Sequence, residues 1–410
     1  MAKPKIRFKG YTNDWEQRKL GDIYGSIGNA FVGTATPYYA EHGHFYLESN
    51  NVKDGQINHN AEIFINDEFY EKQKDKWLHT GDMVMVQSGH VGHAAVIPEE
   101  LDNTAAHALI MFRNPKEEIE PYFLNYEYQT DKAKKQIENI TTGNTIKHIL
   151  ASDMQEFVVD IPKYEEQKVI ASYFCNLDHL ITLHQRKCDQ AKKLKKYMLQ
   201  KMFPKNNESV PEIRFEGFSN DWEQRKLIDY LEVSSENNKD NRFTKDNVLS
   251  VSGEYGIVNQ IEFQGRSFAG ASVSNYGVVE NGDVVYTKSP LKSNPYGIIK
   301  TNKGSPGIVS TLYAVYKPKE ITDSTFVQIY FELDSRMNSY MHPLVNKGAK
   351  NDMKVSAENA LKGMVSFPKK DEQERISLYF STLDHLITLH QKKCDQLKNL
   401  KKFMLQNMFV

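Results

Sequence analysis

The sequence predicts an α+β protein made of two pseudo-symmetric globular halves, each followed by a long helix. Two repeats carry this prediction. A helix phrase of 27 residues, Leu177–Phe203, returns at Leu383–Phe409 with five differences, 206 positions later. An opening motif, Arg7–Leu20, returns at Arg214–Leu227 with three differences in fourteen positions. Because internal repeats of this kind mark duplicated structural units, we expect two equivalent units. Each unit, here called a mount, consists of one opening motif and one helix phrase.

The segment between opening motif and helix phrase, here called the body, differs between the halves. Short β-rich runs such as MVMVQS, AAVIP, VVYTKS and GIVSTLYAVY are separated by Gly, Asn, Asp and Pro. This pattern predicts a strongly curved mixed sheet with added helical segments. Only weak echoes link the bodies, namely GDMVMVQS from Gly81 with GDVVYTKS from Gly282, and IPKYEEQ from Ile161 with FPKKDEQ from Phe367.

The helix phrase has apolar residues at steps of three or four, which is the spacing of one helix face. We expect helices over about 165–203 and 371–409. A long helix with one narrow apolar stripe needs another helix to cover it, and its twin, in antiparallel orientation, is the obvious candidate. Lys195 and Lys401 break the apolar stripe, so we expect either that the seam is interrupted there or that the two lysines extend toward solvent. The helix-interface candidates are Leu177, Leu180, His184, Leu194, Met198, Leu383, Leu386, His390, Leu400 and Met404.

These elements divide the chain into four predicted segments. The two globular domains are expected at 1–162 and 205–368, and the two long helices at 163–204 and 369–410. Each half is then an α+β globule with its own helix. The two histidines of the stripe are expected to be packed or hydrogen-bonded interface residues.

Composition describes an ordinary globular protein. The chain has 410 residues, 40% hydrophobic and 26% charged, with a net charge of -1 and a pI near 6.9. Its apolar runs are shorter than the roughly 18 to 20 residues of a membrane span, and its basic start leads into no apolar signal core, so we expect a cytoplasmic protein. The three cysteines form no CxxC or Cys/His cluster, which argues against a disulfide framework or a zinc site. Any nucleic-acid-binding surface must be a local one.

Catalytic motifs are missing from the sequence. It contains no GxxxxGK[ST] phosphate loop, no GxGxxG after a strand and no GxSxG nucleophile elbow. SNPYG from Ser293 faintly resembles the motif of adenine aminomethyltransferases, but it lacks one proline and a methyl-donor loop. We therefore expect a binder or scaffold without catalytic residues and without a metal site, whose enzymatic work belongs to a partner.

Two different bodies on equivalent mounts could bind an elongated polymer whose geometry nearly repeats. Double-stranded DNA is such a polymer, because its groove positions recur about 34 Å apart. Lys can neutralise phosphate while Asn, Gln and Ser reach base edges, and several polar loops combine these residue types. A solvated turn is the competing interpretation of each loop. The DNA-binding candidates are Gln87, Ser88, His90, Thr142, Asn144, Lys147, His148, Lys288, Ser289, Lys292, Asn294, Lys347, Lys350, Asn351 and Lys354.

The complete layout resembles the specificity subunit of type I restriction-modification systems. The motifs that carry this resemblance are the W-E-x-x-x-L boxes at Trp15 and Trp222, the GD strands at Gly81 and Gly282, the P-x-x-x-E-Q boundaries at Pro162 and Pro368, and the LDxLITLHQ(R/K)K helices. The resemblance implies two target recognition domains, each reading one half of an asymmetric bipartite DNA site. It also implies that the helices form an antiparallel coiled coil that acts as a ruler.

The partners implied by this resemblance are two methyltransferase subunits, which methylate adenine, and two motor-nuclease subunits. No cofactor is expected on this chain, since S-adenosylmethionine, ATP and Mg are implied for the partner subunits. Three alternatives stay open. A stand-alone DNA-binding regulator would keep full specificity in pure form, a coiled-coil adaptor would show no sequence preference, and a self-contained modification enzyme would bind S-adenosylmethionine.

Overall fold

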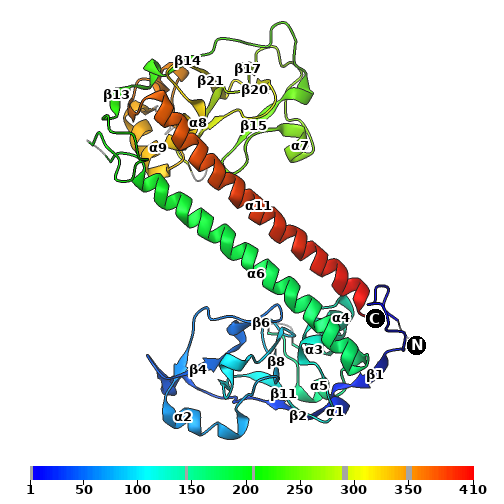
Figure 1. Ribbon diagram of the computed structural model, residues 1–410. Coiled ribbons are helices and arrows are strands. Elements are labelled where there is room, and N and C mark those ends of the chain that lie inside the picture. The colour runs from blue at the N-terminus through cyan, green and yellow to red at the C-terminus, as the bar shows by residue number, and fades with distance from the viewer. Residues whose placement is uncertain (1–2, 144–145, 206–207, 289–293, 348–352) are drawn as a thin grey trace. The chain divides into compact units, whose positions relative to one another are not determined.

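The computed structural model describes residues 3–143, 146–205, 208–288, 294–347 and 353–410. The chain forms two compact units, each of which contains one globule and parts of both long helices (Figure 1). Unit 1 comprises residues 1–185 and 391–410, and unit 2 comprises residues 186–390. The long helices are α6 (Tyr164–Lys201) and α11 (Lys370–Met408), which begin and end within two residues of the expected bounds.

Unit 1 is built around a four-stranded antiparallel sheet in the order β2-β11-β8-β9. These strands are β2 (Tyr24–Asn29), β11 (Leu109–Pro115), β8 (Met83–Val86) and β9 (Ala94–Val96). A second sheet follows the order β10-β4-β7-β3, with β10 (Ala105–Ala106), β4 (His44–Leu47), β7 (Phe64–Ile65) and β3 (Tyr39–Ala40). The short helices are α1 (Leu20–Ile23), α2 (Asp67–Glu71), α3 (Pro121–Glu127), α4 (Asp131–Ile140) and α5 (Ala151–Gln155).

Unit 2 repeats the main sheet in the order β14-β21-β18-β19, again antiparallel. Its strands are β14 (Leu231–Val233), β21 (Tyr313–Pro318), β18 (Val284–Thr287) and β19 (Ile299–Thr301). The remainder differs from unit 1, because β15 (Leu249–Ser252) pairs with β16 (Gly256–Asn259), and β17 (Gly277–Val279) pairs with β20 (Gly307–Val309). The helices of this unit are α7 (Gln260–Gln264), α8 (Ser324–Tyr330), α9 (Asp334–Met341) and α10 (Ala357–Ala360).

The predicted mixed sheet needs a correction, because the main sheet of each unit is antiparallel throughout. The parallel pairing of β10 with β4 lies in the second sheet of unit 1. Among the described strands, only β8–β9 in unit 1 and β18–β19 in unit 2 join consecutive strands of these sheets, so a pattern of short strands and turns does not fix the direction of the other pairings. The sequence therefore predicted the presence of strands more reliably than their directions.

The repeated GD dipeptides form turns that lead into β8 and β18. Gly81 and Gly282 have φ of +87° and +89°, values that glycine adopts readily because it has no Cβ. The carboxylates of Asp82 and Asp283 accept hydrogen bonds from the backbone N–H groups three residues earlier, each at 2.8 Å. Burial raises the pKa of both carboxyl groups, against the lowering by these hydrogen bonds. This motif therefore has a structural role.

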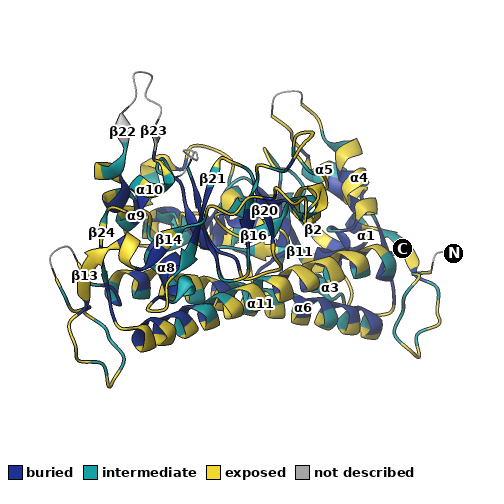
Figure 2. Ribbon diagram, turned by 90° about the horizontal axis from the view of Figure 1, so that it is seen from above, coloured by how far each residue is buried: buried dark blue, intermediate teal, exposed yellow. Residues whose placement is uncertain are grey.

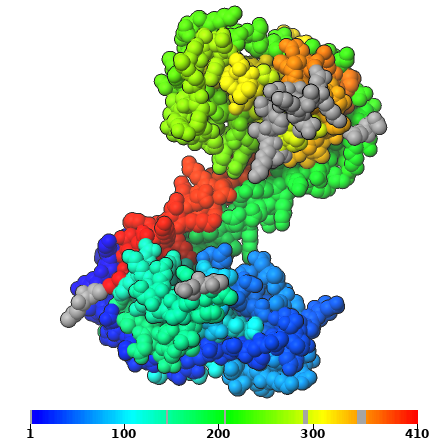
Figure 3. Space-filling view, turned by 180° about the vertical axis from the view of Figure 1, so that it is seen from behind, coloured from blue at the N-terminus to red at the C-terminus, as the bar shows by residue number. Residues whose placement is uncertain are grey.

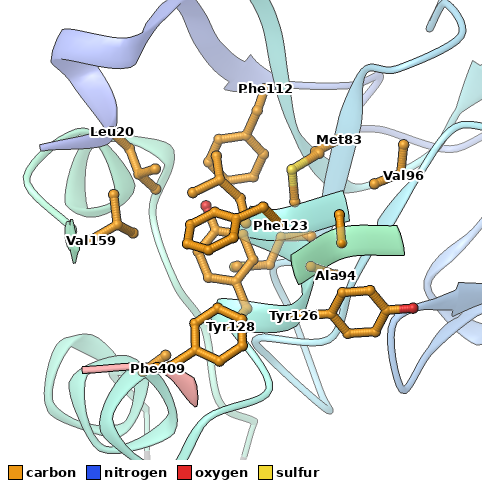
Figure 4. Close-up of a cluster of buried hydrophobic side chains, with 14 of the residues drawn as sticks. Leu20, Met83, Ala94, Val96, Phe112, Phe123, Tyr126, Tyr128, Val159 and Phe409 are labelled. Carbon is orange, nitrogen blue, oxygen red and sulfur yellow. The ribbon is translucent and has the colours of Figure 1, made fainter. Parts of the chain in front are cut away.

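The opening motif of each half pairs with the strand that directly precedes the long helix. The motif contributes β1 (Glu16–Lys19) and β13 (Glu223–Lys226), which pair with β12 (Val158–Ile161) and β24 (Met364–Phe367) in antiparallel register. In unit 1, Trp15 packs edge-on against Phe123 and Phe409, and Figure 4 shows Phe123 and Phe409 within the cluster that includes Phe112 and Tyr128.

The same packing recurs in unit 2. There Trp222 packs edge-on against Phe326 and Phe203. Each tryptophan therefore contacts the helix that follows the main sheet and the last residue of a helix phrase. The conserved order of parts in the two halves produces an equivalent aromatic cluster in each unit.

The P-x-x-x-E-Q boundary fixes the start of each long helix. Arg7 binds Glu166 through Nε and Nη2 at 2.6 and 2.7 Å, and Arg214 binds Glu372 in the same way at 2.7 Å. These side chains are largely buried in both units. Two-point pairing of this kind is geometrically specific, so it holds each opening motif to the first turn of its helix.

The glutamine of this boundary makes a second connection. Gln167 donates to the Pro162 carbonyl at 2.8 Å and accepts from the backbone N–H of Glu120 at 3.0 Å. Gln373 likewise donates to the Pro368 carbonyl at 2.8 Å and accepts from the N–H of Asp323 at 2.9 Å. The side chain thus ties the helix to the chain before it and to the segment that begins α3 or α8.

Within each unit the long helices run antiparallel. In unit 1, Lys401 Nζ lies 2.7 Å from Asp178 Oδ1, and Cys394 Sγ is 4.0 Å from the Ile181 carbonyl. In unit 2, Lys195 Nζ lies 2.6 Å from Asp384 Oδ1. Figure 3 shows the C-terminal end of α11 in red against the first globule, in agreement with the hydrogen bond from Gln406 to Asp131 in unit 1.

The helix seam differs in detail from the predicted stripe. Leu177 and Leu383 are buried, and Met198, Met404, His184 and His390 are half-buried, whereas Leu180, Leu194, Leu386 and Leu400 leave about 40% of their surface exposed. Figure 2 shows the alternating burial along α6 and α11. The buried seam also includes the cysteines Cys188 and Cys394 and the leucines Leu199, Leu397 and Leu405.

The alternative in which Lys195 and Lys401 extend toward solvent is wrong. Their side chains are only 12% and 13% exposed, and their ammonium groups bind carboxylates instead of reaching solvent. The two pairs are related by the repeat, since Asp178 and Asp384 are equivalent, as are Lys195 and Lys401. No helix in the described part of the chain has the length and apolar character required to cross a membrane.

Candidate nucleic-acid interface

In unit 1 the structure brings together two polar loops that are far apart in the sequence. The loop after β8 contains Gln87, Ser88 and His90, and the loop before α5 contains Lys147 and His148. The backbone N–H of Gly89 donates to the Lys147 carbonyl at 3.0 Å, and that of Ile149 donates to the Gln87 carbonyl at 2.9 Å. Isolated β-bridges join Ser88 and Thr142 to His148.

Side-chain exposure makes this double loop suitable for contact with a polymer. His90, Thr142, Lys147 and His148 are exposed, and Gln87 and Ser88 are half-buried. The loop backbone is held by its own hydrogen bonds, which leaves the side-chain donors and acceptors available for readout. These groups offer both phosphate and base-edge contacts. Asn144 lies outside the described residues.

In unit 2 the corresponding loop follows β18. The N–H of Lys288 donates to the Leu312 carbonyl at 3.1 Å, and Asn294 Nδ2 donates to Asp334 Oδ1 at 2.6 Å. Burial lowers the pKa of Lys288, and the charge of Glu358 opposes this effect. Glu358 belongs to α10, so the electrostatic contact places Lys288 near the segment that follows the next candidate loop.

Two of the other candidates in unit 2 lie on a short hairpin. Lys347 belongs to β22 (Asn346–Lys347) and Lys354 to β23 (Met353–Lys354), which pair antiparallel. Ser289, Lys292, Lys350 and Asn351 lie outside the described residues. The assignment of individual base-contacting residues in either unit stays a prediction.

The sequence did not reveal an aromatic and basic surface of unit 2 that the structure assembles. Tyr255 and Phe263 are in ring contact at 5.3 Å, and the guanidinium of Arg266 lies 4.6 Å from the ring centre of Phe268. Their rings are about half exposed. These residues lie within one stretch of fourteen positions, 255–268, over the turn between β15 and β16, α7 and the loop after it, so the local mixture of aromatic and basic residues was a signal that could have identified them.

Unit 1 has a different surface of this kind. The rings of His44 and Tyr70 stack at 3.6 Å, Tyr70 stacks on Trp77 at 4.3 Å, and Lys74 lies over Trp77. Aromatic platforms with neighbouring cations can contact nucleic acid. The described residues contain no group of three or more His, Cys, Asp or Glu side chains arranged to hold a metal ion.

Comparisons with known proteins agree with this architecture. Residues 12–193 match the family described as the type I restriction modification DNA specificity domain. A chain of Methanocaldococcus jannaschii, named as the specificity subunit of a proposed type I restriction enzyme, MjaX, is 24% identical over 95% of this chain and 91% of its own length. The MjaVIII specificity subunit of the same organism is 23% identical over 45% of this chain and 44% of its own length.

A solved structure has the same fold over the whole chain. The S subunit of a type I restriction-modification system from M. genitalium superposes with a TM-score of 0.62 at 14% sequence identity, covering 100% of this chain and 99% of that one. Residues 12–193 thus match a type I restriction modification DNA specificity domain, and the chain is similar over nearly its whole length to the MjaX specificity subunit and, in fold, to a type I S subunit.

Proposed function

We propose that this chain is the non-catalytic, sequence-specific DNA-recognition subunit of a type I restriction-modification complex. Each unit reads one half of an asymmetric bipartite target. Two methyltransferase subunits then methylate adenine, and two motor-nuclease subunits restrict DNA that lacks the modification. S-adenosylmethionine, ATP and Mg belong to those partners, and no cofactor is assigned to this chain.

The observation that carries this proposal is the contrast between mount and body. The Arg7–Glu166 and Arg214–Glu372 pairs have nearly equal distances, and the glutamine contacts repeat as well. Among the described residues of unit 2, no sheet repeats the order β10-β4-β7-β3 of the second sheet of unit 1. A duplicated mount allows each body to be presented to DNA in an equivalent way, while a different body can read a different half-site.

Partner docking is supported by apolar side chains exposed at repeat-equivalent positions of the long helices. Their exposed fractions run from 37% at Leu183 to 53% at Phe403. Unit 1 contains Leu180, Leu183, Leu400 and Phe403, and unit 2 contains the equivalent Leu386, Leu389, Leu194 and Tyr197. Exposed apolar groups that recur in this way indicate an interface, and their duplication suits two copies of one methyltransferase.

The charge balance supports dependence on partners. A net charge of -1 gives little of the phosphate neutralisation that DNA affinity requires. The methyltransferase subunits would supply much of it. We therefore expect weak DNA binding by the isolated chain and tight, specific binding by the complex.

The decisive experiment is a long-read map of methylated adenines in cells that contain active methyltransferase partners. Deletion of the gene should remove one bipartite motif. Exchange of residues 21–160 for the body of another specificity subunit should change one half of the motif and leave the other unchanged. A matched exchange of the second body, between the opening motif and α11, should change the opposite half.

Two outcomes would contradict this reading. A map that does not respond to gene deletion would favour the regulator or the adaptor. A body exchange that altered both half-sites would refute independent reading by the two units.

Docking has a separate test. The double substitution Leu183→Asp and Leu389→Asp should weaken co-purification with the methyltransferase by at least about tenfold, because it places charge on a buried interface. Lys192→Gln and Lys398→Gln form the control, since they change the charge by the same amount and both lysines are exposed, repeat-equivalent and on the opposite side of the same helices from the leucines. Equal loss in both variants would show a general charge effect and not a docking surface.

A further inference from the structure

Unit 1 contains a cleft of about 630 Å³. Residues of the loop after β8 and of the loop before α5 line part of it, and helices line much of the rest. Its walls are the turn Gly89–Ala94, the helices α3 and α4, and the last turns of α11. Its volume lies within the roughly 300 to 1,000 Å³ of small-molecule sites. Gly92 has a φ of +85°, and a Cβ there would lie 2.7 Å from Ile137, so the turn lies close against α4 at this wall.

Asn125 lines the cleft and has a buried side-chain acceptor without a hydrogen-bond partner among the described residues. Asn125 is 1% exposed, and its Nδ2 donates to the Gly55 carbonyl at 2.8 Å. This bond fixes the amide orientation, because a flipped amide would bring two oxygens together. Its Oδ1 is buried and has no hydrogen-bond partner in the described protein. A buried acceptor without a hydrogen bond is destabilising, so a ligand with an N–H or O–H donor would relieve that cost.

The rim of the cleft is cationic. Lys134, Lys147, Lys398 and Lys402 line it and are exposed. Lys398 and Lys402 are four residues apart on α11, an arrangement in which like charges repel on a helix surface. Carboxylates are also present at Asp54, Asp131 and Glu138. Asp131 Oδ2 accepts a hydrogen bond from Gln406 Nε2 of α11 at 3.1 Å.

We propose that this cleft binds one nucleotide, with an N–H group of the base donating to Asn125 Oδ1 and the phosphate binding Lys398 and Lys402. Both features are needed to identify this ligand class, since Asn125 Oδ1 requires a donor and the rim requires an anion. The nucleotide comes either from free solution or from a nucleic acid bound by the chain. The inference goes beyond the bipartite reading of DNA, and its free-nucleotide form does not depend on that function.

In unit 2, the helix positions equivalent to those around the cleft carry side chains that bind other parts of the protein. Gln328 is the fifth residue of α8, as Asn125 is of α3, and its Oε1 accepts from the backbone N–H of Thr301 at 2.9 Å. Arg336 stands where α4 has Ala133, and its guanidinium donates to the Leu199 carbonyl at 2.9 Å. These partners are internal to the protein. The proposal therefore requires one nucleotide per chain and not two.

The test is calorimetric titration of the full chain, or of its complex if the chain needs partners for solubility, with adenosine 5′-monophosphate, adenosine and inorganic phosphate. The proposal expects one equivalent of the nucleotide, bound more tightly than either fragment. Lys398→Glu with Lys402→Glu should weaken its binding at least about tenfold. Lys192→Glu with Lys196→Glu is the matched control, because these exposed lysines of α6 are the repeat equivalents, and it should change binding less than about twofold.

A parallel arm measures fluorescence anisotropy of a random-sequence duplex oligonucleotide. If the nucleotide belongs to nucleic acid, the free nucleotide will not bind, and the α11 pair of substitutions will weaken DNA binding while the α6 pair will not. Nucleotide binding that is insensitive to the α11 substitutions, or matched by inorganic phosphate, overturns the proposal. So does the absence of nucleotide binding together with equal DNA binding by both variants. A methylation map that still follows body exchange would keep the proposed function intact in either case.

Discussion

The two units share a mount and differ in the charges buried around it. In unit 1, Lys401 binds one carboxylate, that of Asp178. In unit 2, the equivalent Lys195 binds two, those of Asp384 and Glu332, each at 2.6 Å. The nearby carboxylates raise the pKa of Lys195 against the lowering by burial. Repetition therefore preserves the helix register, while each globule completes the local charge balance in its own way.

The largest expected effect tests the equality of the two mounts. Arg7→Ala and Arg214→Ala should each lower the free energy of unfolding by roughly 3 to 5 kcal/mol, because each leaves a buried carboxylate without its partner. The two losses should agree, since both pairs have the same geometry and burial. Urea unfolding, followed by hydrogen exchange at the first turns of α6 and α11, measures both effects. A loss confined to one variant would show that the mounts are not equivalent.

A second prediction concerns a buried acid that the units do not share. Glu127 ends α3, whereas Tyr330 ends α8. Burial raises the pKa of Glu127 to about 8. The folded pKa lies above the unfolded value, so the stabilisation is complete below about pH 4.5 and is lost as the pH rises toward 8.

Glu127→Gln should remove this pH dependence. Between pH 5.5 and 8, unit 1 of the unsubstituted chain should lose roughly 3 kcal/mol that the variant keeps. Hydrogen exchange in α3 and α8 across this pH range distinguishes the units, because the phenol of Tyr330, whose pKa burial raises, stays neutral throughout. Parallel pH profiles for the variant and the unsubstituted chain would contradict this assignment.

The single and double carboxylate partners predict a smaller asymmetry. Asp178→Asn should cost about 3 kcal/mol, because Lys401 loses the carboxylate that it binds in unit 1. Asp384→Asn should cost only about 1 kcal/mol, because Glu332 still binds Lys195. Denaturant midpoints of the two variants measure the difference. Addition of Glu332→Gln to Asp384→Asn should raise the cost to that of Asp178→Asn, because Lys195 then loses both carboxylates that it binds. If the cost stays at about 1 kcal/mol, the second carboxylate is not the cause of the asymmetry.

The smallest effect should again be symmetrical. Cys188 and Cys394 are both buried in the helix seam, at 0% and 1% exposure. Replacement of either by Ala removes one sulfur atom from a packed site and should cost about 1 kcal/mol. Thermal unfolding of the two variants provides the measurement, and a difference of more than twofold in the cost would mark unequal packing of the repeated seam.

Sequence reasoning reached the helices and the repeats because both are encoded locally. The 3.6-residue period of the helix phrase gives the helix and its apolar side. It identified only part of the seam, since the predicted Leu177 is buried but Leu194 is partly exposed and Lys195 is enclosed. The reason is that each helix packs against a globule as well as against its twin, so the buried face depends on two neighbours at once.

The candidate interface shows the same division. Polar residue types predicted which loops could contact DNA, and the structure brings the loops after β8 and before α5 of unit 1 together. The cleft could not be predicted, because Asn125 of α3 and Lys398 of α11 come to line one cavity only in the folded unit 1. Asn125 and Lys398 are too far apart in the sequence for a local pattern to predict that they line one cavity.

The sequence alone determined that this protein has two equivalent mounts, two long helices and different bodies, because periodicity and duplication are properties of neighbouring residues and of chain order. Only the tertiary structure decided which charges meet. Arg7 and Glu166 are 159 positions apart, and Asp178 and Lys401 are 223 apart. Such pairs form where packing excludes water, and that environment exists only after the globules and helices have folded together.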